Sequence, residues 1–307
     1  MVSEERFLLF VRALALLFFL YASLSITLRS VTALLILLVA FYATGKSDKS
    51  KVSNPFLRSK ESDLDADLKS SYQKKIADFV FYDPEMSEVL DHFSPAQQQT
   101  QCIFSKTAKL WGAQPWDTTL TFEDNVRRSI PMFIKFTVIG KSLGLDGFLF
   151  ELPAANYGKD PTTFGQGVHR LLKNLSDADP AGVHCMNKSY IDGRGWYFEF
   201  DRESMFITTF SPFYPSSHSR YSFEAPGCYV LFQPEHSFAA HNIEPDTPHT
   251  NWEHPVTIRD KIRVAYKKNG REYLIRDTVY YPTSHDIVKP LGINDEPVQW
   301  WKGEKQE

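Results

Sequence analysis

The chain begins with an apolar run that is too long for an ordinary core helix. Residues 7–45 are interrupted by only two charges, Arg12 and Arg29. A single bilayer-spanning helix needs ~20 apolar residues, and an arginine at its centre is costly. A break near Arg29 is therefore favoured, and we predict a membrane anchor over residues 1–45 with one or two transmembrane helices. The alternative is a signal peptide, whose apolar core of ~7–15 residues fits poorly because apolar character resumes at 31–42.

The residues after this run predict where the rest of the chain lies. Lys46, Lys49 and Lys51 follow directly, and positive flanks stay on the cytoplasmic side of a membrane. A helical hairpin would return both of its ends to that side. The chain has only three cysteines, too few for a disulfide framework, which agrees with a reducing compartment. We therefore predict a membrane protein with the bulk of the chain facing the cytosol.

Composition divides the remainder into two parts. Residues 46–72 are charged, rich in serine and poor in apolar side chains, which predicts a flexible linker. Residues 73–307 are long enough for one globular domain with a sizeable core. The aromatic content of 14% supports this, and the net charge of −3 gives no reason to expect nucleic acid as a partner.

Several short segments are typical of strands. Residues 195–201 alternate Trp196, Phe198 and Phe200 with polar neighbours, the period of two of a half-buried strand. A turn at residues 202–204 would then make a hairpin with the next strand. Composition rich in aromatic and β-branched residues predicts the other strands. The full set of predicted strands is 130–140, 147–152, 195–201, 205–210 and 228–233.

Two segments have helical periodicity. Residues 162–176 place Phe164, Val168, Leu171, Leu172 and Leu175 on one stripe. Residues 256–268 place Ile258, Ile262 and Ala265 on one face with basic residues around the rest. Helices between groups of strands predict an α+β fold with a mainly antiparallel sheet and flanking helices. The tail from residue 282 reads as irregular, with Trp300 and Trp301 packing back on the domain.

Residues 211–238 hold more polar side chains than a strand–turn–strand needs. His218, Arg220, Cys228, Gln233 and His236 fall within this aromatic-rich stretch. Such a density of side chains that can ligate, pair or hydrogen-bond indicates a candidate site. No G-x-S-x-G elbow and no glycine-rich phosphate loop after a strand occur in the chain, which argues against a serine hydrolase of that class and against nucleotide binding.

An ordered set of motifs carries a resemblance to a known family. The set is QCIFSKTAKLWGA (101–113), RLLKNLSDADP (170–180), GRGWYFEFDRESMFITTFSPFYPSSHSRYSF (193–223), VLFQPEHSF (230–238) and IRDKIRVAY (258–266). Together they resemble the YqcI/YcgG family, also called GntA-like, over roughly residues 75–275. The resemblance implies an α+β fold. Some members are haem proteins that hydroxylate a nitrogen, notably the guanidino group of arginine, using dioxygen.

The resemblance implies roles for particular side chains. Haem needs an axial ligand, an apolar slot and cations for its propionates. His218 or Cys102 could ligate the iron, and Arg220 could pair with a propionate or a substrate carboxylate. Phe213 and neighbouring rings could line the slot. The plainer alternatives are a turn histidine bonded to backbone, a buried cysteine, a surface ion pair and ordinary core rings.

Further polar residues complete the predicted site. Gln233 could hydrogen-bond oxygen or substrate, and Glu235 or Glu199 could hold a guanidinium. The predicted function is a membrane-anchored, haem-dependent oxygenase that N-hydroxylates a guanidino or amino group of a small substrate such as arginine, with electrons from a reductase. The alternative is a non-catalytic, membrane-tethered binding domain of the same fold. A third possibility uses four loop histidines to bind zinc or non-haem iron: His236, His241, His249 and His254.

Overall fold

The computed structural model describes residues 82–244, 247, 249–271, 273 and 282–303, and every structural statement below concerns these residues. The described residues all belong to one compact unit of the chain. The predicted anchor over 1–45 and the linker over 46–72 lie outside the described residues. Within the described part, no helix is long and apolar enough to cross a bilayer.

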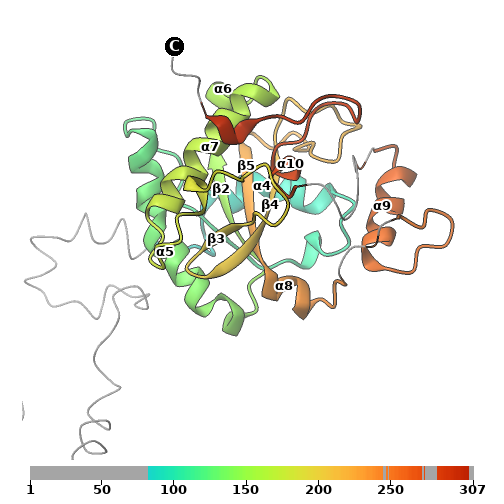
Figure 1. Ribbon diagram of the computed structural model, residues 1–307, viewed down its shortest axis with the longest axis horizontal. Coiled ribbons are helices and arrows are strands. Elements are labelled where there is room, and N and C mark those ends of the chain that lie inside the picture. The colour runs from blue at the N-terminus through green and yellow to red at the C-terminus, as the bar shows by residue number, and fades with distance from the viewer. Residues whose placement is uncertain (1–81, 245–246, 248, 272, 274–281, 304–307) are drawn as a thin grey trace, which may run out of the picture. The chain divides into compact units, whose positions relative to one another are not determined.

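A five-stranded, mostly antiparallel sheet forms the centre of the domain (Figure 1). The strand order is β1-β2-β5-β4-β3. Only β1 and β2 run parallel, and the other three neighbouring pairs are antiparallel. The predicted α+β class with a mainly antiparallel sheet is therefore confirmed. The strands are β1 Leu110–Gly112, β2 Gly147–Leu152, β3 Phe198–Phe200, β4 Glu203–Phe210 and β5 Cys228–Pro234.

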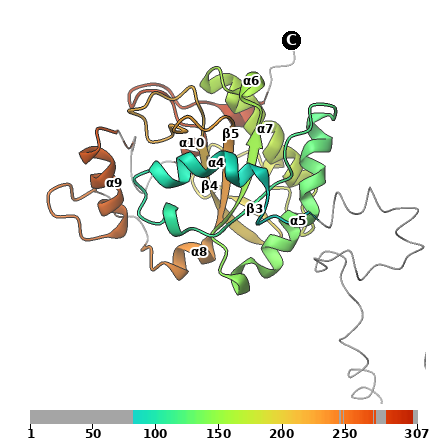
Figure 2. The same ribbon diagram turned by 180° about the vertical axis from the view of Figure 1, so that it is seen from behind.

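Helices cover the two faces of the sheet unequally. Alternate residues of a strand point to opposite faces, so β5 sends Val230 and Phe232 into the larger core under α5 and α7, and Tyr229 and Leu231 into a smaller one under α4. Figure 2 shows α4 in front of the sheet, on the side opposite to the view of Figure 1. The longer helices are α4 Glu88–Gln99, α5 Phe122–Leu143, α7 Pro161–Asp177 and α9 Ile258–Lys268. The short ones are η3 Ser105–Thr107, α6 Ala154–Tyr157, η4 Cys185–Asn187, α8 Glu235–Ala240, α10 Ser284–Ile287 and η5 Trp300–Lys302.

The strand predicted over residues 130–140 is wrong, because this segment lies inside helix α5. Its aromatic and β-branched composition favoured a strand, but its buried residues follow helical spacing. Phe133, Phe136 and Gly140 succeed one another at intervals of three and four residues and face the core. The helix begins after Thr121, whose side chain accepts a hydrogen bond from the Asp124 amide, and ends at Gly144 in the left-handed conformation. The spacing of the buried residues therefore indicates the secondary structure of this segment better than its composition does.

The β3–β4 hairpin is confirmed, but its turn lies earlier than predicted. Phe200 pairs with Glu203, so the turn consists of Asp201 and Arg202 rather than residues 202–204. Both turn residues have positive φ, 52° and 64°, as a type I′ hairpin requires. Strand β3 is also shorter than the predicted 195–201. The alternation holds, since Trp196, Phe198 and Phe200 are all buried.

Both predicted helices exist, and one of them turns an unexpected face inward. In α7 all five predicted stripe residues are fully buried. Helix α9 begins at Ile258, after the capping residue Thr257, and its buried residues are Asp260, Arg263 and Tyr266. The predicted apolar face, which includes Ile262, is only half-buried. At the end of the described chain Trp300 is buried and packs on the larger core, as predicted.

Candidate functional site

A cavity of about 170 Å³ lies on the face of the sheet that α4 only partly covers. Strands β4 and β5 contribute Phe206, Thr208, Leu231 and Gln233 to its wall. Most of the rest of the wall comes from α4, the segment that follows it, the loop after β4, α8 and α9. Ile262 belongs to this wall, so the half-buried apolar face of α9 looks into a cavity rather than onto packed core.

Polar groups at the cavity come mainly from residues far apart in sequence. Arg220 and Gln233, both predicted site residues, line it, as does Cys102. The structure therefore brings these three together. Gln233 accepts a hydrogen bond from the Thr208 hydroxyl at 3.1 Å, across the β4–β5 pair. Ser219, beside Arg220, is 4% exposed and its hydroxyl has no hydrogen-bond partner among the described residues.

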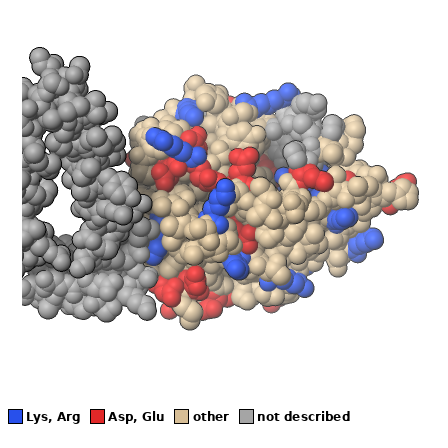
Figure 3. Space-filling view, turned by 90° about the horizontal axis from the view of Figure 1, so that it is seen from below, with Lys and Arg blue, Asp and Glu red and all other residues tan. Residues whose placement is uncertain are grey.

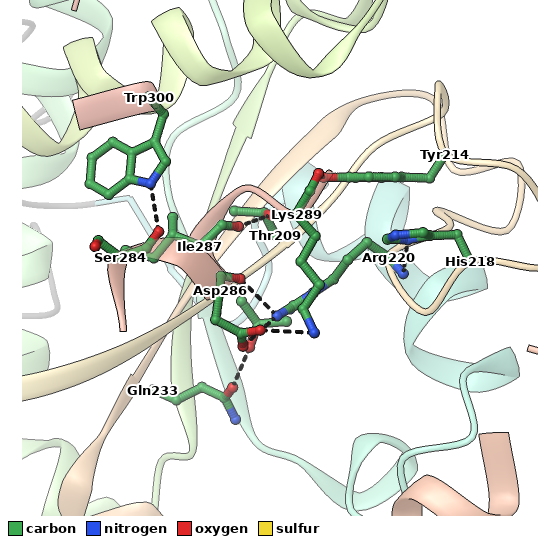
Figure 4. A network of polar contacts seen from close by, with 11 residues as sticks. Thr209, Tyr214, His218, Arg220, Gln233, Ser284, Asp286, Ile287, Lys289 and Trp300 are labelled. Atoms are coloured by element: carbon green, nitrogen blue, oxygen red, sulfur yellow. Dashed lines mark hydrogen bonds and ion pairs between the residues drawn. The ribbon is translucent and has the colours of Figure 1, made fainter. Parts of the chain in front are cut away.

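Arg220 is held in the wall by a buried group of charges (Figure 4). Its Nη2 donates to the Asp286 carboxylate and to the Asp286 carbonyl, each at 3.0 Å. The Lys289 Nζ lies 2.8 Å from the other carboxylate oxygen of Asp286. All three side chains are buried. Burial lowers the pKa of Lys289 to about 8, although the Asp286 carboxylate favours its charged form. One carboxylate thus serves two cations in the interior.

His218 lies beside this group and outside the cavity wall. Its Nδ1 accepts from the Arg220 amide at 3.0 Å, which leaves Nε2 to donate to the Pro290 carbonyl at 3.1 Å. The ring stacks on Tyr214 with centroids 4.3 Å apart. Burial, and then the cations Lys289 and Arg220, lower the pKa of His218 to about 4. The side chain is therefore a neutral imidazole with both nitrogens bonded to backbone.

The cysteines differ in what surrounds them. Cys102 lines the cavity, and burial raises the pKa of its thiol. Cys228 is buried in β5 against the Ser211 hydroxyl, and burial raises its pKa to about 12. Cys185 is buried with its sulfur 3.4 Å from the Glu199 backbone. Of the three, Cys102 alone belongs to the cavity wall.

The remaining predicted site residues lie elsewhere. Glu235 is exposed at the start of α8, and Glu199 is on β3; neither lines the cavity. Phe213 packs against the larger core, edge-on to Phe164 at 5.7 Å. Sequence reasoning missed Asp146, a carboxylate that does line the cavity. The signal available for it was an acidic residue immediately before the apolar strand β2.

The four loop histidines do not come together. His236 pairs with Glu203 at 3.2 Å, and His241 pairs with Asp146 at 2.6 Å. His249 and His254 are exposed. Among the residues that the structure describes, no group of three histidine, cysteine or acidic side chains is placed to hold a metal ion.

Charge on the surface is mixed. Figure 3 shows Lys and Arg side chains interspersed with Asp and Glu on the face seen from below. Interspersed charges of both signs produce no strong steering field over that face. The gathering of Arg220, Arg259 and Arg263 at the cavity wall is therefore a local feature of the site.

Comparison with known proteins identifies the domain. Residues 139–266 match the YqcI/YcgG family. The chain contains a YqcI/YcgG family domain. The predicted family resemblance is thus confirmed over a shorter span than the predicted 75–275. The YqcI/YcgG match includes Arg220, Gln233 and Arg259, whereas Cys102 and Asp286 lie outside it. No curated protein and no solved structure matches the chain significantly.

The haem implied for some YqcI/YcgG proteins can be tested against these residues. A cavity of about 170 Å³ is close to the ~150 Å³ of one that holds a benzene ring, and below the ~300–1,000 Å³ of sites for drug-sized ligands. His218 offers no free ring nitrogen, and Cys102, which does line the cavity, faces a space too small for a porphyrin. As the described residues are arranged, they do not fit a porphyrin with either predicted axial ligand.

Proposed function

We propose that this cavity is the binding site for a small molecule with a mainly apolar body. The observation that carries the proposal is an apolar cavity between sheet and helix, with polar groups restricted to a few positions. Phe93, Phe206, Phe210, Leu231 and Ile262 supply the apolar wall. A few polar groups set into an apolar wall are the usual design of small-molecule sites.

Packing alone does not account for this space. Protein interiors are filled to a density of ~0.74–0.76, with few voids larger than a water molecule. Here the apolar face of α9 is only half-buried, and Ile262 on this face lines the cavity instead of packing against the sheet. Tyr266 ties α9 to the end of α4 by a hydrogen bond to the Thr100 hydroxyl. Because this bond holds α9 in place, the space between α9 and the sheet is a fixed feature of the fold.

We expect benzyl alcohol, used as a probe of one ring, to stabilise the full-length protein. Ligand at ten times its dissociation constant adds about 1.4 kcal/mol to the free energy of unfolding, and the midpoint of thermal unfolding reports it. Replacing Ile262 by Trp fills the cavity from a half-buried position and should abolish the shift. Lys261→Trp, at an exposed position of the same helix, should retain it. Equal shifts in both variants would refute the proposal.

Haem-dependent N-hydroxylation stays a prediction from the family resemblance. The observation in its favour is that Cys102 and Arg220, both predicted for a haem site, line one cavity. The absorbance spectrum of the full-length protein, expressed with added haem precursor, tests this prediction. A Soret band would establish a haem protein, and the reduced carbonyl band would separate thiolate from imidazole ligation. A featureless visible spectrum from folded protein would refute it. The predicted reductase partner depends on the same result.

A further inference from the structure

We propose that the ligand of this cavity is a small carboxylate, with its anionic group received by Ser219 and by the guanidinium groups of Arg220 and Arg259. This inference rests on the proposed function and adds the charge class of the ligand. The three side chains come from two segments, the loop after β4 and helix α9, and all of them line the cavity. The apolar body of the ligand would lie against the rings and leucine of the sheet face.

The charges of the wall favour an anion over a cation. Arg220, Arg259 and Arg263 line the cavity, and the carboxylate in its described wall is that of Asp146. That carboxylate already accepts from the Lys109 amide at 2.9 Å, as well as from Ser237 and His241, so both of its oxygens already take part in hydrogen bonds. An amine or guanidine would therefore meet arginines without finding a carboxylate that is not already hydrogen-bonded.

Ser219 supplies a donor that lacks an acceptor. It is 4% exposed, and its hydroxyl makes no hydrogen bond with any described residue. A buried hydroxyl without a partner costs stability. A ligand oxygen in the cavity would satisfy it, and the position of Ser219 next to Arg220 allows one carboxylate to use both residues.

Arg220 has donors left over after its internal bonds are made. A guanidinium carries five N–H donors, and both side-chain hydrogen bonds that Arg220 makes with described residues leave from Nη2 toward Asp286. No described residue accepts from its Nε or Nη1. Asp286 thus fixes the orientation of the group, as Figure 4 shows, while a second edge stays open. A planar edge of this kind suits a carboxylate, which binds through two parallel hydrogen bonds.

Arg259 offers a similar opportunity from α9. Its Nε donates to the Glu244 carbonyl at 3.0 Å, and its guanidinium lies 5.9 Å from the centre of the Phe238 ring. No described residue accepts from either terminal nitrogen of Arg259. A half-buried arginine on a helix can approach a ligand without disturbing the core.

Size restricts the body of the ligand. The cavity holds about 170 Å³, close to the ~150 Å³ of a cavity that takes benzene. One aromatic ring or a short aliphatic chain, with one carboxylate, matches this volume. The inferred class is therefore a single-ring or short-chain monocarboxylate.

Three probes that share one ring separate charge from shape: benzoate, benzyl alcohol and benzylamine, each titrated calorimetrically into the full-length protein. We expect benzoate to bind about tenfold more tightly than benzyl alcohol, the effect of one charge-assisted hydrogen bond, and benzylamine to bind less tightly than either. Benzyl alcohol binding as tightly as benzoate would overturn the inference while leaving the proposed function intact. Binding by none of the probes would refute both.

Two mild variants test the residues. Ser219→Ala and Arg259→Gln should each weaken benzoate about tenfold and leave benzyl alcohol binding unchanged. Arg127→Gln, at an exposed arginine on α5 outside the cavity, is the matched control and should leave both affinities unchanged. Unchanged benzoate affinity in Ser219→Ala and in Arg259→Gln would overturn the inference. So would benzoate binding that survives Ile262→Trp, because that ligand would be bound elsewhere.

Discussion

Replacing Asp286 by Asn is expected to lower the free energy of unfolding by about 3–5 kcal/mol, the usual cost of removing one partner from a buried ion pair. The Asp286 carboxylate lies 3.0 Å from Arg220 Nη2 and 2.8 Å from Lys289 Nζ. The side chains of these three residues are at most 9% exposed. The amide would leave two cations in the interior without the carboxylate that they share. Denaturant unfolding, monitored by circular dichroism, measures the change.

An exposed ion pair provides the matched control. Lys173 and Asp177 pair on the surface of α7, with side chains 39% and 49% exposed. Asp177→Asn makes the same chemical change and should alter the free energy of unfolding by less than about 1 kcal/mol. Equal costs for the two substitutions would show that the buried pair contributes no more than a surface pair.

The buried charges also connect parts of the domain that are distant in sequence. Asp286 belongs to α10, which packs beside β4, while Arg220 belongs to the loop that follows β4. Just after α10, Lys289 forms an ion pair with Asp286, and the Pro290 carbonyl accepts a hydrogen bond from His218. The chain after α10 therefore fixes the loop that presents Ser219 and Arg220 to the cavity. Stability and site geometry depend on the same contacts.

Local patterns in the sequence predicted the elements that one periodicity describes. In α7, the leucines and Phe164 recur at helical spacing, and the capping Asp160 and Pro161 mark the start. Strand β5 was also predicted, at nearly its full length. Residues 130–140 misled because Ile, Phe, Thr and Val are typical of strands. The feature that distinguishes a helix here is the spacing of Phe133, Phe136 and Gly140, which the structure shows to be buried along one side of the segment.

The site could be predicted only in part, because distant residues determine it. The polar cluster of residues 211–238 did contribute Ser219, Arg220 and Gln233 to the cavity. His218, however, is turned away by the Pro290 carbonyl, 72 residues further along the chain. Arg220 finds its carboxylate 66 residues away. No local pattern contains these pairings, which become visible only when the chain has folded.

His218 is expected to make the stability of the domain depend on pH between about 6.5 and 4. Its pKa falls from the ordinary value of about 6.5 to about 4 on folding, chiefly because it is buried and also because Lys289 and Arg220 repel a further positive charge. Above pH 6.5 the His218 side chain is neutral in both the folded and the unfolded protein, so the stability contributed by its neutral ring is fully present. As the pH falls, the unfolded chain takes up a proton first, and about 3 kcal/mol is lost by pH 4.

Two variants that do not titrate isolate this effect. His218→Asn keeps an acceptor near the Arg220 amide, and His218→Gln keeps a donor within reach of the Pro290 carbonyl. Both lose bonds and should be less stable than the wild type at pH 7. Carboxylates also titrate in this range, so the quantity to measure is the difference in unfolding free energy between wild type and variant at each pH. That difference should shrink by about 3 kcal/mol from pH 7 to pH 4. A constant difference would contradict this prediction. It would mean that the folded protein accepts a second proton on His218 although Nδ1 already accepts a hydrogen bond from the Arg220 amide.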